Sequence, residues 1–321
     1  MKMDIKQKLL PQYLEESRAV VTSFNFGLPK NLEIPEGIMG IGDNAFKDCT
    51  LIESVSIPGT VDRIGNDAFA GCKNLKKVVI KDGVNSICAG AFCNCTALES
   101  VAIGEGVERI ELSVFYNCEN LTNITLPSTL KEILQFDLNA SIKIPAIEKL
   151  NYNGTLAQWC AMNWNEVLVS KAKNITLGDG TDLRTLTTLS IPDSVTEIGV
   201  NAFYNCKSLT TVTIPNSVKT IGFQAFEGCT SLTDITIPSS VMEIAFNAFL
   251  SCKSLKNVKF SDTTGWHTMG GWKNKREIPI DDISTMIHPP VTNLDDPNLK
   301  YYSDRNWYYK KLYKKMTKDG Q

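Results

Sequence analysis

The chain has 321 residues, of which 43% are hydrophobic and 21% are charged, and its formal net charge at pH 7 is −2. So small a net charge provides no long-range attraction to nucleic acid or to an anionic membrane. Because no apolar run reaches the roughly 18 residues that a membrane-spanning helix needs, the composition predicts a large buried core and no membrane span.

Residues 1–30 precede the regular part of the sequence, and we expect them to form an N-terminal cap that covers the first apolar coil. Met3–Glu16 is compatible with a short helix interrupted by Pro11, and the apolar residues between Val20 and Phe26 alternate as in a strand. The first residues are charged and lack the apolar segment of a signal peptide, so the sequence predicts no export signal.

From residue 31 onward the sequence repeats with a period of 23 residues, in two blocks separated by an interruption near residues 135–185. A fixed period of about 20–50 residues indicates a solenoid, in which each repeat is one coil of the chain. The positions that recur are Cys49, Cys72, Cys95, Cys118, Cys206, Cys229 and Cys252; Phe46, Phe69, Phe92, Phe115, Phe203, Phe226 and Phe249; and Ile41, Ile64, Ile87, Ile110, Ile133, Ile198, Ile221 and Ile244.

Each repeat contains one expected strand and a return arm. In the repeat that begins at Leu75, Val78 and Ile80 lie on one face of an extended segment, because strand side chains alternate. A proline such as Pro58 follows the strand in most repeats and ends it, since proline has no N–H to donate. The apolar residues of Val61–Cys72 are spaced by three and four, which predicts an inward-facing helical or 3₁₀ turn. Stacked coils of this kind bury a continuous core.

The repeat can be written L-x-x-V-x-I-P-x-x-V-x-x-I-G-x-x-A-F-x-x-C-x-x, and this motif resembles the leucine-rich repeats of BspA-like bacterial proteins over about residues 31–260. Tyr152–Trp159 also resembles the Y-x-G-T-x-x-Q-W insertion common in such proteins. The resemblance implies an α/β repeat fold, a strand-dominated, right-handed and horseshoe-like leucine-rich-repeat solenoid with a single curved parallel sheet. It also implies a bacterial surface protein that adheres to host matrix proteins or to other cells.

The interruption at about residues 135–185 contains its own expected elements. These are a strand over residues 147–152, a helix over Leu156–Met162 that Thr155 caps through its hydroxyl, and a strand over Ile175–Leu177. One interpretation is a thicker variant coil that keeps the stack continuous. The other is an elaboration that offers aromatic side chains to a partner, with the two tryptophans suited to carbohydrate. Those aromatic residues are Tyr152, Trp159 and Trp164.

Residues 261–321 lack the repeat and are rich in tryptophan and tyrosine, which predicts a C-terminal aromatic cap and a basic tail. The basic and aromatic segment Lys310–Lys315 could contact nucleic acid or acidic lipid. It is short, however, and no recognised nucleic-acid module accompanies it, so we expect a solvated tail and no nucleic-acid partner.

The ten cysteines are expected to be reduced. Seven of them occupy one repeat position, where a free cysteine behaves as a small buried hydrophobic residue. The other three are Cys88, Cys93 and Cys160, and none has the spacing of a redox pair or of a zinc ligand set.

The sequence contains little that would indicate a catalytic site, a cofactor site or a metal site. The only histidines, His267 and His288, follow the repeats and have no nucleophile motif nearby. No phosphate-binding glycine motif is present. Asp179 and Asp182 flank a glycine, but two carboxylates are too few for a calcium loop. The sequence therefore predicts a protein without enzymatic activity, cofactor or metal site.

The repeats do predict an outward sheet face whose side chains form rows across the coils. We select eight positions as candidate partner-binding residues: Thr188, Thr211, Asp234 and Asn257 in one row, and Ser190, Thr213, Thr236 and Lys259 in the other. Threonine is a good strand former, so these rows could instead serve only solubility. Because the rows lack the aromatic residues that anchor tight interfaces, we expect weak or multivalent contacts.

The sequence therefore predicts a non-catalytic protein-binding repeat protein with a host-matrix or cell-surface partner. The resemblance places it at the cell surface or in the secreted fraction. The missing export signal keeps a second hypothesis open, that of a cytoplasmic scaffold, and the insertion tryptophans keep open a third, a carbohydrate-binding surface protein.

Overall fold

The computed structural model describes residues 20–21, 28–134, 146–245, 247–262, 266–270, 274–277 and 311–314. The expected helix over Met3–Glu16 lies outside these ranges, as does His288. The chain divides into two compact units, one comprising Met1–Gly154 with Lys171–Gly180 and the other Thr155–Ser170 with Thr181–Gln321.

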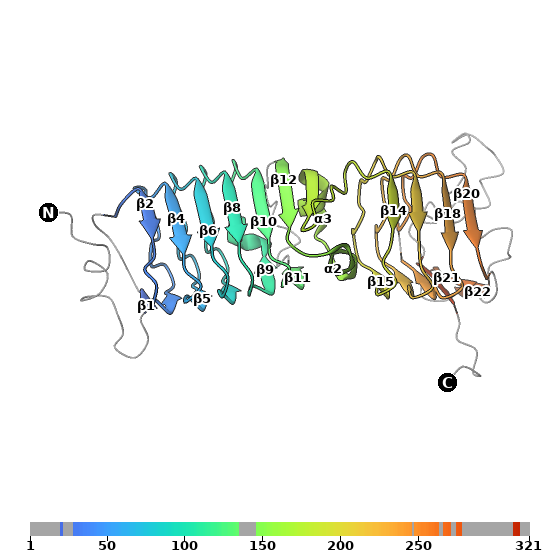
Figure 1. The fold of residues 1–321 in the computed structure, drawn as a ribbon, viewed down its shortest axis with the longest axis horizontal. Helices are drawn as coiled ribbons and strands as arrows, with labels where there is room; N and C mark the ends of the chain where they lie inside the picture. The colour runs from blue at the N-terminus through green and yellow to red at the C-terminus, as the bar shows by residue number, and fades with distance from the viewer. Residues whose placement is uncertain are drawn as a thin grey trace. The chain divides into compact units, whose positions relative to one another are not determined.

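The first unit contains a seven-stranded parallel sheet, its front sheet, in the order β13-β12-β10-β8-β6-β4-β2 (Figure 1). Neighbouring strands from successive repeats pair without any offset, so that Ser54 lies opposite Lys77 and Lys77 opposite Ser100. The strands are β2 (Asn31–Glu33), β4 (Ser54–Ile57), β6 (Lys77–Ile80), β8 (Ser100–Ile103), β10 (Asn123–Leu126), β12 (Ile147–Tyr152) and β13 (Ala172–Leu177). This parallel sheet of stacked coils confirms the predicted fold class.

Shorter strands form where each coil returns. Four of them make a parallel sheet in the order β1-β3-β5-β7, and β9 pairs with β11. Their bounds are β1 (Val20–Val21), β3 (Gly40–Ile41), β5 (Arg63–Ile64), β7 (Ser86–Ile87), β9 (Arg109–Glu111) and β11 (Glu132–Leu134). Each coil is therefore held to its neighbours on two sides by backbone hydrogen bonds.

The second unit repeats this arrangement. Its front sheet has the order β14-β16-β18-β20, and its return strands β15, β17 and β19 are parallel (Figure 1). The bounds are β14 (Thr188–Ser190), β15 (Glu197–Ile198), β16 (Thr211–Thr213), β17 (Thr220–Ile221), β18 (Asp234–Ile237), β19 (Glu243–Ile244) and β20 (Asn257–Phe260).

Three strands beyond the repeats extend the sheet of return strands in the second unit. They are β21 (Trp266–Gly270), β22 (Asn274–Glu277) and β23 (Lys311–Lys314). Strand β23 pairs antiparallel with β19, and β21 pairs antiparallel with both β23 and β22. The antiparallel direction ends the stacking of parallel coils. The role of residues 261–321 as a C-terminal cap, like that of residues 1–30 at the other end, stays a prediction.

For the return arms the sequence predicts an inward-facing helical or 3₁₀ turn, and most of the described arms are turns that do not continue as a helix. In the first repeat Asn44 and Asp48 adopt left-handed φ angles of 60° and 58°, and an α-helix cannot continue through such residues. Glycine, asparagine and aspartate tolerate this conformation best. The residues with positive φ at these two repeat positions are Asn44, Asp67, Gly90, Asn201, Gln224 and Asn247 at the first, and Asp48, Gly71, Asn94, Asn117, Asn205, Gly228 and Ser251 at the second.

One described return arm does form the predicted 3₁₀ helix, η1 (Leu112–Phe115). It includes Ser113, which stands at the first of the two repeat positions, and the neighbouring repeat has Gly90 there with a φ of 66°. The local turn thus differs between coils while the stacking of the coils is unchanged.

Phenylalanine and cysteine form the interior behind the turns. The ring centroids of Phe46 and Phe69 lie 4.8 Å apart with an interplanar angle of 7°, and those of Phe226 and Phe249 lie 5.4 Å apart at 2°. The thiol of Cys72 donates a hydrogen bond of 3.2 Å to the carbonyl oxygen of Phe46, one coil earlier. The same bond recurs at Cys95, Cys118, Cys229 and Cys252. The repeated cysteine is therefore a small core residue that also satisfies a buried carbonyl oxygen.

The interrupted repeat adds two strands, β12 and β13, to the front sheet of the first unit, and confirms the strands expected there. The predicted helix is α2 (Leu156–Ala161), and Thr155 and Gln158 form a capping box at its start. Helix α3 (Glu166–Lys171) was not predicted from the sequence. Its six residues are too short to show a clear helical period.

Truncation of a stacked phenylalanine should destabilise the coils. We expect Phe226→Ala to lower the free energy of unfolding by about 3–5 kcal/mol, because it removes a buried ring from the stack. Phe223, three residues earlier in the same coil, is 39% exposed and provides the matched control. Urea unfolding followed by circular dichroism would compare the two variants, and equal midpoint shifts would contradict a structural role for the stack.

Candidate binding surface

The front sheet of the second unit displays the eight candidate residues on its outer surface. All eight side chains are exposed, whereas the intervening Leu189, Val212 and Ile235 are buried. The two rows are held in line by backbone pairing, since Thr188 lies opposite Thr211 and Asp234 opposite Asn257. The alternation of exposed polar and buried apolar residues is what a sheet with one solvated face requires.

Only two of the eight candidate residues on this face, Asp234 and Lys259, are charged. Asn257 donates a hydrogen bond to the carboxylate of Asp234. This bond, followed by one from Thr233, lowers the pKa of Asp234. Asp234 is therefore ionised at neutral pH, and Lys259 in the other row carries the opposite charge. The remaining six residues offer hydroxyl and amide groups, which donate and accept hydrogen bonds to peptide groups without charge selectivity.

The front sheet of the first unit offers a less open surface. Val79, Ala102 and Thr125, which occupy the row equivalent to Thr213, are only half exposed. Polar side chains there bond to one another across coils, as Ser54 does to Asn31 over 2.8 Å and Asn151 to Thr125 over 3.3 Å. The bond between Asn257 and Asp234 is the corresponding cross-coil bond on the second unit.

The burial of the three aromatic residues in the insertion shows that one prediction was wrong. Trp159, Trp164 and Tyr152 are 0%, 1% and 1% exposed, so they do not form the partner-binding or carbohydrate-binding surface that we considered. In the second unit the Trp159 indole donates to the carbonyl oxygen of Ala202 over 2.6 Å, and the Trp164 indole donates to that of Trp159 over 2.9 Å. Large aromatic rings with satisfied N–H groups contribute strongly to burial, which explains their inward position.

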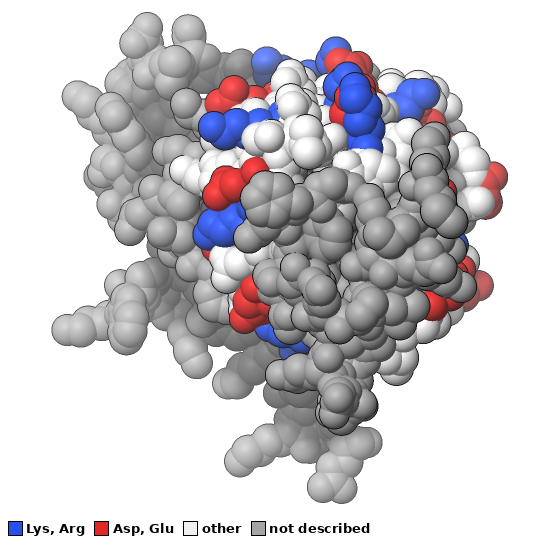
Figure 2. Space-filling view, turned by 90° about the vertical axis from the view of Figure 1, so that its left-hand side faces the viewer, with Lys and Arg blue, Asp and Glu red and all other residues white. Residues whose placement is uncertain are grey.

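Residues of opposite charge alternate over the described surface at one end of the first unit, as Figure 2 shows. Elsewhere in the first unit, as well as near this end, oppositely charged residues pair between coils, as Lys131 does with Glu108 and Lys30 with Glu53, each at 2.6 Å. Exposed pairs of this kind contribute little stability. The two members of each pair neutralise one another, so the described residues of this surface show charges of both signs side by side.

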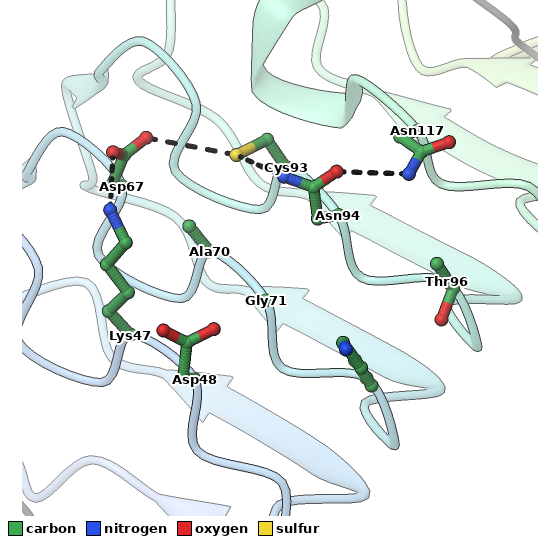
Figure 3. Close-up of a pocket in the computed structure, with 10 residues that line it drawn as sticks. Lys47, Asp48, Asp67, Ala70, Gly71, Cys93, Asn94, Thr96 and Asn117 are labelled. Atoms are coloured by element: carbon green, nitrogen blue, oxygen red, sulfur yellow. Dashed lines mark hydrogen bonds and ion pairs between the residues drawn. The ribbon is translucent and has the colours of Figure 1, made fainter.

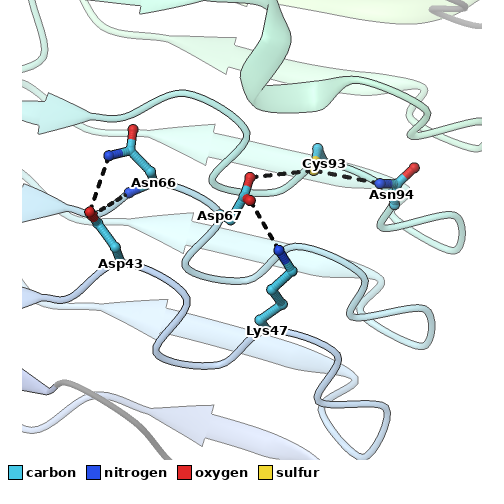
Figure 4. Close-up of polar contacts among 6 residues, drawn as sticks. All are labelled: Asp43, Lys47, Asn66, Asp67, Cys93 and Asn94. Atoms are coloured by element: carbon cyan, nitrogen blue, oxygen red, sulfur yellow. Dashed lines mark hydrogen bonds and ion pairs between the residues drawn. The ribbon is translucent and has the colours of Figure 1, made fainter.

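A pocket that the sequence did not indicate lies on the turns of the first unit, with a volume of about 490 Å³ (Figure 3). Two of its charged side chains form an ion pair, since Lys47 Nζ lies 3.1 Å from Asp67 Oδ2 (Figure 4). Cys93 Sγ lies 3.8 Å from the other oxygen of Asp67. Burial, together with Asp67, raises the pKa of the Cys93 thiol. The pocket therefore contains a protonated thiol at neutral pH and not an activated nucleophile.

The repeated cysteines are likewise unsuited to chemistry. Burial raises the pKa of Cys118 and of Cys252 to about 12 each. All ten cysteines of the chain are free, and seven of them are buried. The described residues include no group of three or more histidine, cysteine, aspartate or glutamate side chains that could hold a metal ion. Within those same residues, none of the helices has the length and apolar character needed to cross a membrane.

Comparison with known proteins agrees with this geometry. The family model described as BspA type leucine rich repeat region matches six copies, over residues 23–152 and 181–271. No match was found among curated proteins. Solved structures of leucine-rich repeat proteins are also similar to the chain, at low sequence identity.

Three of these structures illustrate the similarity. A leucine rich cell surface protein from Faecalibacterium prausnitzii is 21% identical over 79% of this chain and 93% of its own, with a TM-score of 0.35. A leucine rich repeat protein from T. pallidum is 20% identical over 78% and 89%, with a TM-score of 0.33. A leucine-rich repeat protein from Bacteroides ovatus is 22% identical over 77% and 85%, with a TM-score of 0.29.

The stacked 23-residue coils define a leucine-rich repeat protein, a class whose members are generally not enzymes. Because the family model matches well over half of the residues, the chain belongs to the BspA-type leucine-rich repeat family.

Thiol accessibility gives a direct check of the interior. In native protein at neutral pH, a thiol reagent should modify the half-buried Cys88 and Cys93, and Cys49 more slowly because burial raises its pKa to about 11. The seven buried cysteines should react only after unfolding. Labelling followed by mass spectrometry identifies the modified positions. Rapid native labelling of Cys95 or Cys229 would contradict the packing described here.

The raised thiol pKa values also predict the direction of the pH dependence. An unfolded thiol releases its proton near pH 9, whereas Cys118, Cys160 and Cys252 hold theirs to about pH 12 when folded. The unfolded state thus binds fewer protons above pH 9, and the free energy of unfolding should fall from pH 9 toward pH 12. Urea midpoints at pH 7.5, about pH 9 and about pH 10.5 measure this. An unchanged midpoint would show that the thiols are not buried in this way.

Proposed function

We propose that this protein binds other proteins without catalysing a reaction, through the front sheet of its second unit, and that it acts in adhesion at a bacterial surface. The observation that carries the proposal is the two rows of exposed small polar side chains, Thr188 to Asn257 and Ser190 to Lys259, on a sheet fixed by in-register pairing. A rigid backbone holds these groups in place, so binding need not order them first.

The chemistry of the rows fits an extended protein segment. Hydroxyl and amide groups can hydrogen-bond to backbone N–H and C=O groups of a partner. No large aromatic or arginine side chain stands in either row, and such residues dominate tight interfaces. The face therefore suits modest affinity for each contact, with strength gained from several contacts at once.

The family supports the surface location, since the BspA-like resemblance implies bacterial surface proteins that adhere to matrix proteins. The competing role is a cytoplasmic scaffold, which the same fold could serve. Buried cysteines do not separate the two, because a thiol that is protected by packing stays reduced in either compartment. The identity of the captured partner does separate them.

The test compares the chain with substituted versions in a binding assay. Purified protein is immobilised and exposed to fibronectin, laminin and collagen, and separately to lysate of the producing cell. We expect saturable binding to a matrix protein, weakened about tenfold or more by Thr213→Lys combined with Thr236→Lys, because long charged side chains would disrupt the centre of the face.

The matched control is Thr196→Lys, an exposed threonine of the same unit that lies outside the front sheet. Equal loss of binding in the control and in the double variant would remove the front sheet as the binding surface. Retention of a lysate protein with no matrix binding would support the scaffold role in place of adhesion.

A further inference from the structure

The pocket on the turns of the first unit lies where two neighbouring repeat positions hold small residues, Ala70 and Gly71. The two adjacent coils carry larger side chains at the same positions, and these line the pocket on either side (Figure 3). They are Lys47 and Asp48 on one side and Cys93 and Asn94 on the other. The volume of about 490 Å³ falls within the roughly 300–1,000 Å³ that small-molecule sites occupy.

Gly71 keeps this hollow open. Its φ angle is 72°, in the left-handed region that glycine adopts without strain. A Cβ atom at this position would lie 2.1 Å from Asp48 Oδ1, so the aspartate side chain occupies the space that a side chain of residue 71 would need. The backbone fixes this arrangement, because Asp48 N donates to the carbonyl oxygen of Ala70 over 2.8 Å. The Asp48 carboxylate therefore lies directly against the floor of the pocket.

A chain of polar contacts holds one side of the pocket in place, as Figures 3 and 4 show. Lys47 Nζ lies 3.1 Å from Asp67 Oδ2, and the Cys93 thiol donates to Asp67 Oδ1 over 3.8 Å. Asn94 Nδ2 donates to Cys93 Sγ over 3.6 Å, and Asn117 Nδ2 donates to Asn94 Oδ1 over 3.0 Å. These contacts join four successive coils. A ligand that enters the pocket therefore meets side chains that are already ordered, which lowers the entropic cost of binding.

Two charged groups of the lining stand outside this chain of contacts. Within the described part of the chain, neither the Asp48 carboxylate nor the Lys73 ammonium has a hydrogen-bond or ion-pair partner. A carboxylate and an ammonium thus line the same hollow from successive coils, and both are available to a ligand. Charge-assisted hydrogen bonds to such groups are about twice as strong as neutral ones.

The balance of charges restricts the kind of ligand that fits. The lining has two lysines and two aspartates, Lys47, Lys73, Asp48 and Asp67, so its formal charge is zero. A simple cation would be repelled by the lysines, and a simple anion by the aspartates. A small molecule that carries an ammonium and a carboxylate can pair with Asp48 and Lys73 at the same time. The Thr96 hydroxyl adds a neutral donor and acceptor for a polar side chain of the ligand.

We propose that this pocket binds a small zwitterion with a polar side chain, of the chemistry that a free amino acid and a short peptide share. Asp48 pairs with the ammonium group of the ligand, and Lys73 pairs with its carboxylate. Asn94, Asn117 and Thr96 bond to its polar side chain. This site lies in the first unit, so the proposal does not depend on protein binding by the front sheet of the second unit.

The Cys93 thiol provides the readout, because it lines the pocket and is only half buried. The full chain is labelled with a thiol reagent, with and without glutamine or glycylglutamine, and mass spectrometry follows Cys93 and Cys88 separately. Cys88 is also half buried but does not line the pocket, so it is the internal control. At a ligand concentration about ten times the dissociation constant, labelling of Cys93 should slow about tenfold, because only unoccupied protein reacts. Labelling of Cys88 should not change.

Substitutions test the two charged groups. Asp48→Asn and Lys73→Gln should each weaken protection of Cys93 about tenfold or more, because each removes one charge-assisted contact. Asparagine occurs at the repeat position of Asp48 in Asn94 and Asn117, so the turn accepts it. The matched control is Lys76→Gln, which removes an exposed lysine of the same coil that does not line the pocket, and it should leave protection unchanged.

A variant that fills the hollow gives a second test. Tyr116 and Tyr204 stand at the repeat position of Ala70 in other coils, so Ala70→Tyr should fold normally. Its ring would occupy the pocket, and calorimetry should detect no ligand binding, while the melting temperature stays close to that of the original chain.

The ligand arms separate the two sources of the zwitterion. Protection by glutamine alone would assign the site to free amino acids, and stronger protection by glycylglutamine would assign it to short peptides. Absence of protection by both would overturn the site. Equal protection by acetate or methylammonium would also overturn it, as would equal loss of protection in Lys76→Gln and Lys73→Gln, since either result would mean binding without recognition of both charges.

Discussion

The structure depends on backbone hydrogen bonds that join each coil to the next at the turns as well as at the strands. In the first unit Phe46 N donates to the carbonyl oxygen of Ala68 over 2.7 Å, and Asp48 N donates to that of Ala70 over 2.8 Å. Every second N–H in this segment points toward the neighbouring coil. This happens because residues with left-handed φ angles stand four positions apart. Turn backbone that would otherwise need water is thereby satisfied within the protein.

This bonding explains why the repeat length is constant. One residue more or less between two cysteines would shift a strand by one position and exchange its buried and exposed faces. With the inward residues constrained in this way, variation is confined to outward positions such as Thr213 and to the turn positions of Lys47 and Gln224. The binding surface proposed here accordingly consists of rows of side chains that run across several coils.

Much of the fold could be predicted from the sequence, because a period of 23 residues specifies stacking whatever the local details. The capping of α2 by Thr155 and the exposure of the threonine rows followed from equally local rules. For the return arms the sequence predicted a helical or 3₁₀ turn, because spacings of three and four fit consecutive turns as well as a helix. The asparagines at positions such as Asn44 and Asn94 were the available signal for the difference.

The sites were harder to predict than the fold. Trp159 and Trp164 carry polar N–H groups and belong to an insertion, so the sequence cannot tell an exposed pair from one whose N–H groups are satisfied internally. The pocket at Lys47 and Cys93 joins residues from different coils, so the sequence did not indicate it.

Hydrogen–deuterium exchange of the native chain tests most directly whether the turns hold the coils together. The account predicts that the amides of Phe46, Phe69 and Phe226, which donate to the next coil, exchange as slowly as those of the front strands β6 and β18. Fast exchange at these amides, with protection confined to the strands, would show that the turns are open to water and would contradict the account.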